Sequence, residues 1–129
     1  MLLLVASLLT CADARTISFA GHLWDVRTGY GGPGPNHWSD SASDVWVDGN
    51  GWLHLKITNV GGTWYCAEVT AQGVAHYGMN RFYVESRLDQ LDRNVVLALF
   101  LYKDDSHEID IEFSKWGDPG SWFNSQYVV

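Results

Sequence analysis

The sequence has few cysteines and no apolar run long enough to cross a membrane. Its 129 residues include two cysteines, Cys11 and Cys66, and Cys11 lies in the apolar N-terminal stretch. If that stretch is cleaved off, Cys66 is the one remaining thiol and an intrachain disulfide is excluded. The apolar run of residues 2–9 is too short for a membrane-spanning helix, so we expect no membrane partner.

Basic residues are scarce as well. The chain has 8 Lys and Arg against 15 Asp and Glu, which gives a net charge of −7. A surplus of negative charge repels polyanions, so we expect no nucleic-acid partner. A neutral glycan is compatible with this charge, and the seven tryptophans supply rings on which sugars can stack.

Motifs for metals and common cofactors are missing. The five histidines are scattered, and no H-E-x-x-H, phosphate-binding loop, dinucleotide fingerprint or G-x-S-x-G motif occurs. We therefore expect no required cofactor and assign no metal ligands. Cys66, between Tyr65 and Ala67, is expected in a buried strand position, with a nucleophilic thiol as the alternative.

The N-terminus resembles a secretory leader. Residues 2–9 form its apolar part, and Ala12-Asp13-Ala14 matches an A-x-A cleavage site. We expect residues 1–14 to be a signal peptide, residues 15–129 to be one domain, and the protein to be secreted or periplasmic. A lipoprotein at Cys11 and a buried first strand or helix are the alternatives.

The hydrophobic pattern predicts strands and no helix. Short strands at intervals of 8 to 12 residues, separated by glycine- and aspartate-rich turns such as Gly61-Gly62, are typical of a β-sandwich. In residues 52–57, alternation predicts Leu53, Leu55 and Ile57 facing a core. Residues 30–36, with two prolines and three glycines, read as a loop. The remaining predicted strands are residues 16–27 (broken at Gly21), 64–72, 81–88, 95–102, 107–113 and a strand beginning at 126.

Residues 107–113 are the stretch around which the rest is organised. Glu108, Asp110 and Glu112 alternate with Ile109, Ile111 and Phe113, so a strand places three carboxylates on one face.

Such a row costs stability, because like charges repel and carboxylates are expensive to desolvate, so it suggests work on a ligand. Paired carboxyls suit glycoside hydrolysis, in which one attacks the sugar and the other protonates the leaving oxygen. On a flat strand, residues four apart lie about 13 Å apart, so Glu108 and Glu112 would have to lean together. A solvated surface strand, or a Ca²⁺ site using Asp104 and Asp105, is the alternative.

The segment from Glu108 to Phe113 resembles the active-site signature of glycoside hydrolase family 16, in the form found in endo-β-1,3-1,4-glucanases. The likeness extends upstream to Tyr65-Cys66-Ala67-Glu68, to Tyr77-Gly78, to residues 82–85 and to the apolar residues 95–102. Two departures are Thr70, where the family has an arginine, and Met79-Asn80-Arg81 after the glycine. These departures bear on which sugar and which linkage the protein would cleave, not on the class of reaction.

The resemblance implies roles for particular residues. Glu108 would be the nucleophile, Glu112 the acid/base, and Asp110 would assist between them. Glu68 would bind a sugar hydroxyl. Further candidates for substrate contact are Asn36, Trp38 and Trp116, with turn or core roles as the alternatives.

The resemblance also implies a fold and a partner. The family fold is a concanavalin A-like jelly-roll β-sandwich, of which this chain would be the N-terminal part, truncated at the C-terminus. A structural calcium ion is common in the family. We therefore expect a monomeric, retaining endo-β-glucanase acting on mixed-linkage or β-1,3-glucan polysaccharide. A carbohydrate-binding sandwich that does not cleave is the main alternative, and a Ca²⁺-dependent structural domain is another.

Overall fold

The structure is a computed structural model that describes residues 14–73 and 77–129. The chain divides after Val74 into two compact units, called here unit 1 (residues 14–73) and unit 2 (residues 77–129). Each unit is described by itself. The predicted signal peptide lies outside the described residues, apart from Ala14.

The described residues form an all-β protein, as predicted. Within residues 14–73 and 77–129 there is no α-helix, and the single helical turn is the 3-10 turn η1, Leu88–Gln90. None of these residues forms a helix long and apolar enough to cross a membrane. The strands of unit 1 are β1 (Thr16–Phe19), β2 (His22–Val26), β3 (Gly29–Gly31), β4 (Asn36–Trp38), β5 (Val45–Val47), β6 (Leu53–Leu55), β7 (Thr58–Val60), β8 (Thr63–Cys66) and β9 (Val69–Ala71). Those of unit 2 are β10 (Leu97–Asp104), β11 (His107–Phe113) and β12 (Ser125–Val128).

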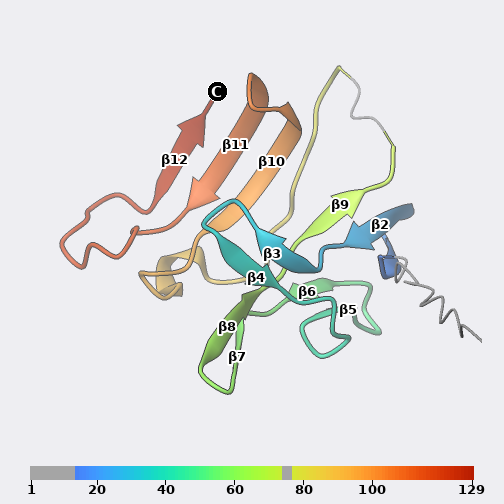
Figure 1. Ribbon diagram of the computed structural model, residues 1–129. Helices are drawn as coiled ribbons and strands as arrows, with labels where there is room; N and C mark the ends of the chain where they lie inside the picture. The colour runs from blue at the N-terminus through green and yellow to red at the C-terminus, as the bar shows by residue number, and fades with distance from the viewer. Residues whose placement is uncertain (1–13, 74–76) are drawn as a thin grey trace, which may run out of the picture. The chain divides into compact units, whose positions relative to one another are not determined.

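Unit 1 contains three small sheets. Their strand orders are β1-β2-β9, β3-β4-β8-β7 and β5-β6. All neighbouring strands are antiparallel except β4 and β8, which pair in parallel through His37 with Tyr65 and Trp38 with Cys66. Segments far apart in the sequence therefore lie side by side (Figure 1).

Two hairpins of unit 1 have turns that their residues favour. Ala20 and Gly21 connect β1 to β2 with φ of 51° and 79°, and Gly61 and Gly62 connect β7 to β8 with φ of 59° and 90°. Positive φ at both central residues matches the twist of the flanking strands. The predicted breaks at Gly21 and Gly61-Gly62 are confirmed.

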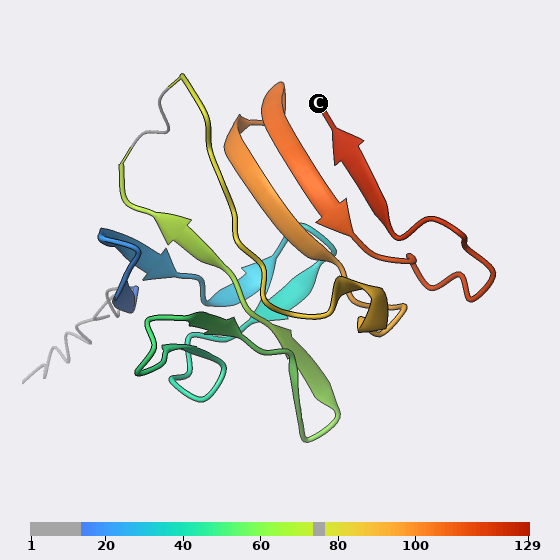
Figure 2. The same cartoon turned by 180° about the vertical axis from the view of Figure 1, so that it is seen from behind.

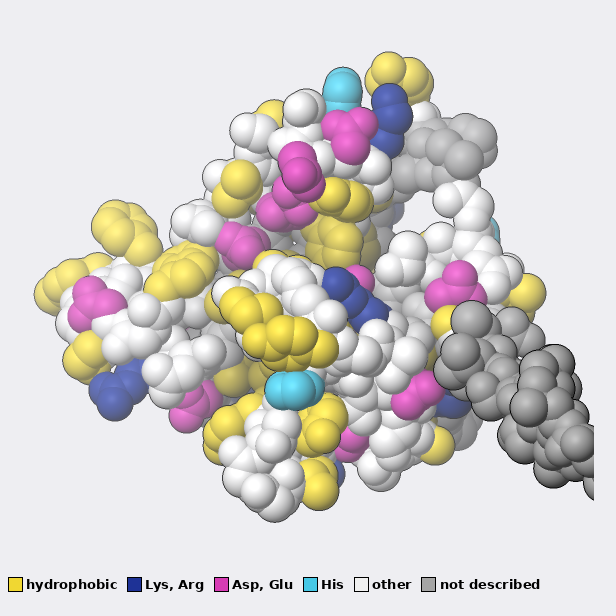
Figure 3. Space-filling model, in the orientation of Figure 1, with side chains coloured by type: hydrophobic (Ala, Val, Ile, Leu, Met, Phe, Trp, Pro, Cys, Tyr) yellow, Lys and Arg dark blue, Asp and Glu magenta, His cyan; other side chains and the backbone are white. Residues whose placement is uncertain are grey.

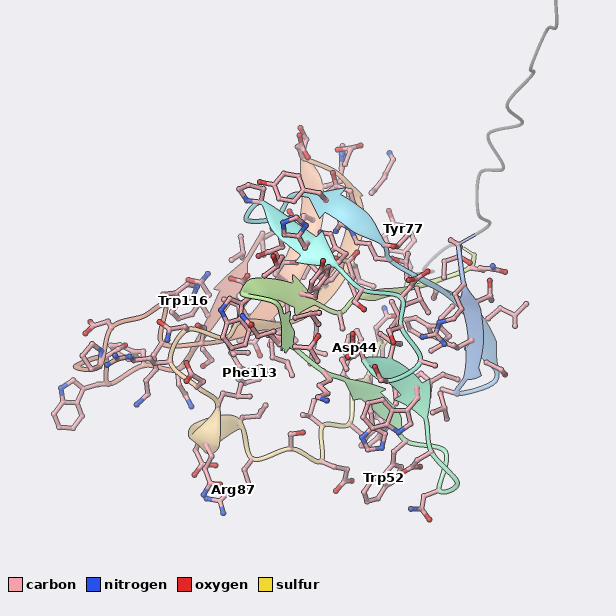
Figure 4. All side chains as sticks on the ribbon, turned by 60° about the horizontal axis from the view of Figure 1, so that its bottom comes forward. Asp44, Trp52, Tyr77, Arg87, Phe113 and Trp116 are labelled. Atoms are coloured by element: carbon pink, nitrogen blue, oxygen red, sulfur yellow. The ribbon has the colours of Figure 1, made fainter. Side chains whose placement is uncertain are left out.

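The buried hydrophobic residues lie in unit 1. Val26 and Val45 are fully buried, and Trp38 is 8% exposed. Asp44, the residue directly before Val45 and β5 (Figure 4), is buried as well and is 5% exposed. The prediction for residues 52–57 was partly wrong, because Leu55 and Ile57 are 48% and 38% exposed.

Unit 2 is built on one antiparallel sheet with the order β10-β11-β12 (Figures 1 and 2). The central strand β11 pairs along its whole length with β10 and from Asp110 to Phe113 with β12. The predicted strand at 107–113 is therefore present with the predicted ends, and those at 95–102 and from 126 are present with shifted ends.

Three strand predictions need correction. Residues 64–72 form two strands, β8 and β9, which belong to different sheets and are separated at Ala67 and Glu68. Residues 81–88 form no strand and have no ladder partner. The loop expected at 30–36 is shorter, because β3 and β4 pair Tyr30 with His37 and Gly31 with Asn36.

Candidate active site

The three carboxylates of β11 share one face of the unit 2 sheet. On a strand, residues two apart point to the same side, and directly paired residues share that side. Glu108 lies opposite Tyr102, Asp110 lies between Phe100 and Val128, and Glu112 lies between Ala98 and Gln126. All three carboxylate side chains are half-buried. Figure 3 shows acidic side chains gathered over β10 and β11.

Neighbouring strands supply partners to part of this row. Gln126 Nε2 of β12 donates a hydrogen bond to Glu112 Oε2. Tyr102 of β10 donates from its hydroxyl to Asp105 Oδ1 at 2.8 Å; this hydrogen bond is the largest cause that raises the Tyr102 pKa, and the charges of Asp105 and Glu108 raise it further. Asp110 Oδ1 is buried and has no hydrogen-bond partner among the described residues. A buried acceptor without a partner carries a desolvation cost that a ligand hydroxyl would remove.

The electrostatics of the row favour protonation of two of its members. Partial burial is the largest cause that raises the pKa of Glu108, and the charges of Asp110, Asp105 and Glu112 raise it further. Burial and the charge of Glu112 likewise raise the pKa of Asp110. A hydrogen bond from the protonated Glu108 to Asp110 raises the Glu108 pKa further and opposes the rise in the Asp110 pKa. The row can therefore hold a proton at a pH where an isolated carboxyl has lost it.

The opposite face of the same sheet is apolar and only partly covered. Ile109 was predicted to face a core, but it is 51% exposed, whereas Ile111 and Phe113 are half-buried. Phe113 ends β11 (Figure 4). A hollow of about 440 Å³ lies on this face, and its lining includes Phe82, Val84, Leu99, Ile111, Phe113 and Tyr127. Residues 82–84 thus contact the sheet face without joining the sheet.

Trp116 follows the carboxylate strand directly, in the loop between β11 and β12 (Figure 4). Its backbone has a φ of 45°, and its N–H donates to Ser114 Oγ at 2.9 Å. The ring is 46% exposed, so it has free surface for a ligand. Trp122, farther along the same loop, is 98% exposed.

Glu68 lies in unit 1, where Arg27 holds its carboxylate. Arg27 Nη1 lies 2.7 Å from Glu68 Oε2, and the backbone N–H of Arg27 donates to the Glu68 carbonyl at 3.0 Å. The Arg27 guanidinium also stacks 4.3 Å from the centroid of the Trp38 ring and donates to the Gly32 carbonyl. Arg27 therefore brings two predicted site residues, Glu68 and Trp38, into one cluster.

Trp38 and Asn36 are engaged within the protein. The Trp38 indole N–H donates to the Gly31 carbonyl at 3.2 Å, and the side chain is buried. Asn36 Nδ2 donates to the Pro33 carbonyl at 2.7 Å and closes the turn between β3 and β4. Gly34 in this turn has a φ of 125°, and a Cβ there would meet Asn36 Nδ2 at 2.5 Å. These contacts match the turn and core alternatives for the two residues.

Three residues of these clusters were not singled out from the sequence. Arg27 is 41 positions from Glu68, Gln126 is 14 positions from Glu112, and Tyr102 is recognisable only once β10 is paired with β11. The predicted apolar strand at 95–102 was the one signal available, and it placed Tyr102 at a strand end without indicating which face the residue occupies.

Metal and thiol chemistry have little support in this structure. Within residues 14–73 and 77–129, no three His, Cys, Asp or Glu side chains form a group that could hold a metal ion. No ligands are therefore assigned to the calcium ion that the resemblance implies. Cys66 is a free, half-buried thiol whose pKa is raised by burial, which is the opposite of what a nucleophilic cysteine needs.

Comparisons with protein families, with curated proteins and with solved structures gave no match for this chain. What the chain does is therefore inferred from its own residues and their geometry.

Proposed function

We propose that this chain carries the catalytic strand of a retaining endo-β-glucanase that cleaves a mixed-linkage or β-1,3-glucan. The observation that supports the proposal best is the row of Glu108, Asp110 and Glu112 on one face of the central strand of a sheet. The finer fold belongs to the same proposal: a jelly-roll β-sandwich of the concanavalin A type. We also propose that the protein is a secreted or periplasmic monomer and that its partner is a polysaccharide.

The reaction would proceed by two displacements. Glu108 attacks the anomeric carbon as a carboxylate, the glycosidic C–O bond breaks, and Glu112 gives its proton to the leaving oxygen. Water then attacks the glycosyl-enzyme, Glu112 takes a proton from that water, and Glu108 departs as a carboxylate. The charge balance of the first step needs Glu108 as the ionised carboxyl and Glu112 as the protonated one.

Asp110 would couple the two catalytic carboxyls. Its charge raises the pKa of Glu108. Its buried Oδ1 offers an acceptor to a sugar hydroxyl or to a protonated neighbour. Outside the row, Trp116 of unit 2 is proposed to contact the glycan with its partly exposed ring. Glu68 of unit 1, held by Arg27, is proposed as an acceptor of a sugar hydroxyl.

The test is hydrolysis of soluble mixed-linkage glucan and of β-1,3-glucan, measured as reducing ends released. Glu108→Gln and Glu112→Gln should each abolish release, because each removes one half of the pair. Glu85→Gln is the matched control, since Glu85 is an exposed glutamate of the same unit outside the row. Binding of both glucans without hydrolysis by the parent chain would favour the non-cleaving alternative. A Glu108→Gln variant as fast as the parent would refute the assignment.

A further inference from the structure

A second cluster with ligand-binding chemistry lies in unit 1, on the sheet β3-β4-β8-β7. Tyr30 of β3, His37 of β4 and Tyr65 of β8 occupy paired positions and therefore share one face. Their ring centroids are 4.7 Å and 5.5 Å apart, so the three rings form one continuous row, called here the aromatic row. Tyr30 is 66% exposed, His37 is exposed and Tyr65 is half-buried.

The aromatic row continues into a polar hollow. Tyr65 belongs to the row and also lines a hollow of about 340 Å³, and Thr58, which pairs with Tyr65 across β7 and β8, lines it too. Figure 3 shows hydrophobic side chains gathered over β4 and β8 on the face turned to the viewer. The other lining residues that matter here are Ser39, Asp44, Lys56 and Asn59.

The hollow is organised by one buried carboxylate. Asp44 is 5% exposed and accepts hydrogen bonds from Ser39 Oγ at 2.6 Å, from Thr58 Oγ1 at 3.3 Å and from Ser43 Oγ at 3.3 Å. Because these hydroxyls direct their hydrogens to Asp44, the lone pairs that protein donors leave free remain as acceptors; Ser39 Oγ already accepts from the Ser41 N–H at 3.2 Å. Lys56 and Asn59 add donors at the same hollow. The hollow thus offers acceptors and donors to a polyhydroxylated ligand.

We propose that the aromatic row and the polar hollow form a glycan-binding site of unit 1, distinct from the carboxylate strand of unit 2. Pyranose rings of a β-glucan chain would pack their apolar faces on Tyr30, His37 and Tyr65 and place hydroxyls in the hollow. A few placed polar groups beside an aromatic surface are typical of small-ligand sites. A polyanion fits poorly, because Lys56 is the one Lys or Arg in the hollow and the chain is acidic. The inference uses no residue of β11, so it stands apart from the proposed hydrolysis.

Binding is best measured on the full chain carrying Glu108→Gln, with tetrasaccharides of β-1,3-glucan and of mixed-linkage glucan as probes. Resonances of the Tyr30, His37 and Tyr65 rings should shift on titration and follow one binding curve. Tyr30→Ala and Tyr65→Ala should each weaken that affinity by about tenfold, and Tyr65→Phe, which keeps the ring, by much less. Trp64→Ala is the matched control: Trp64 is the neighbouring residue of β8, is 64% exposed and points to the other face. Its variant should bind within about twofold of the parent.

Two results would overturn the inference. One is a titration in which tetrasaccharide, raised to its highest soluble concentration, shifts the resonances of β11 residues alone or shifts no resonance. The other is an equal loss of affinity in Trp64→Ala and in Tyr65→Ala. Shifts in the aromatic row together with no hydrolysis by the parent chain would support this inference and contradict the proposed hydrolysis.

Discussion

Arg27 and Glu68 are 41 residues apart in the sequence and form a half-buried ion pair, with Arg27 Nη1 at 2.7 Å from Glu68 Oε2. The same guanidinium stacks on the buried Trp38 ring. A carboxylate held in this way is fixed in direction, as an acceptor of sugar hydroxyls must be.

Replacing Arg27 should therefore destabilise the fold more than replacing an arginine of an exposed pair. Arg27→Met leaves Glu68 without its charged donor and removes the stacking, so we expect a loss of about 2 kcal/mol in the free energy of unfolding. Arg87→Met is the control, because Arg87 and Asp89 are both more than half exposed and such pairs contribute less than about 1 kcal/mol. Urea unfolding curves measure both variants, and equal losses would contradict the role given to Arg27.

Asp110 should set the acidity of Glu108. Burial is the largest cause that raises the Glu108 pKa, and the charge of Asp110 and a hydrogen bond to it raise the pKa further, so Asp110→Asn should lower that pKa part of the way toward its ordinary value of 4.5. A nucleophile acts only when ionised, so the acid limb of the hydrolysis profile should move to lower pH in the variant. A ¹³C titration of the Glu108 carboxyl measures the effect directly. A pKa that stays constant or rises would show that Asp110 does not act on Glu108.

The hairpin of β5 and β6 should lose stability in strong acid. Hydrogen bonds from the Trp52 backbone and from His54 lower the pKa of Asp48 from 3.8 to about 2. A folded-state pKa below the unfolded value gives stability that is present above about pH 3.8 and is lost as the pH falls through about 2. Asp48→Asn should therefore be less stable than the parent at pH 5, and the gap should close near pH 2. Thermal unfolding across this range tests it, and a gap that does not change with pH would contradict the linkage.

Burial in unit 1 can be tested with one substitution at two positions. Val45 is fully buried, so Val45→Ala should cost about 2 kcal/mol through lost apolar contact and a residual cavity. Val60 is 65% exposed, and Val60→Ala should cost less than about 0.5 kcal/mol. Urea unfolding of the two variants measures the difference, and equal costs would place the core elsewhere.

Local chemistry made part of the fold predictable. Glycine-containing turns at Gly21 and Gly61-Gly62 need positive φ and were found from the sequence, as was the alternation that defines β11. Pairing partners were harder to predict. Residues 64–72 look like one strand, but their two ends hydrogen-bond to β4 and to β2, so the strand breaks at Ala67 and Glu68.

Side-chain exposure and long-range contacts were the least predictable features. Alternation shows which residues of a strand share a face, but it does not show what covers that face. Leu55, Ile57 and Ile109 were therefore predicted to face a core, whereas they are exposed. For the candidate site, the sequence placed the three carboxylates on one face, because that depends on β11 alone. It did not place Arg27 against Glu68 or Gln126 against Glu112, since those contacts depend on how separate strands pair.

The most direct test of the central claim is the stereochemistry of the first product from β-glucan, followed by ¹H NMR of the anomeric proton, for the parent chain and for Glu108→Gln. Retention requires Glu108 and Glu112 to bring their carboxyls within about 5.5 Å of each other around the bound sugar. The account predicts that the parent releases the β-anomer first and that Glu108→Gln releases no product. Release of the α-anomer first, or undiminished release by Glu108→Gln, would contradict it.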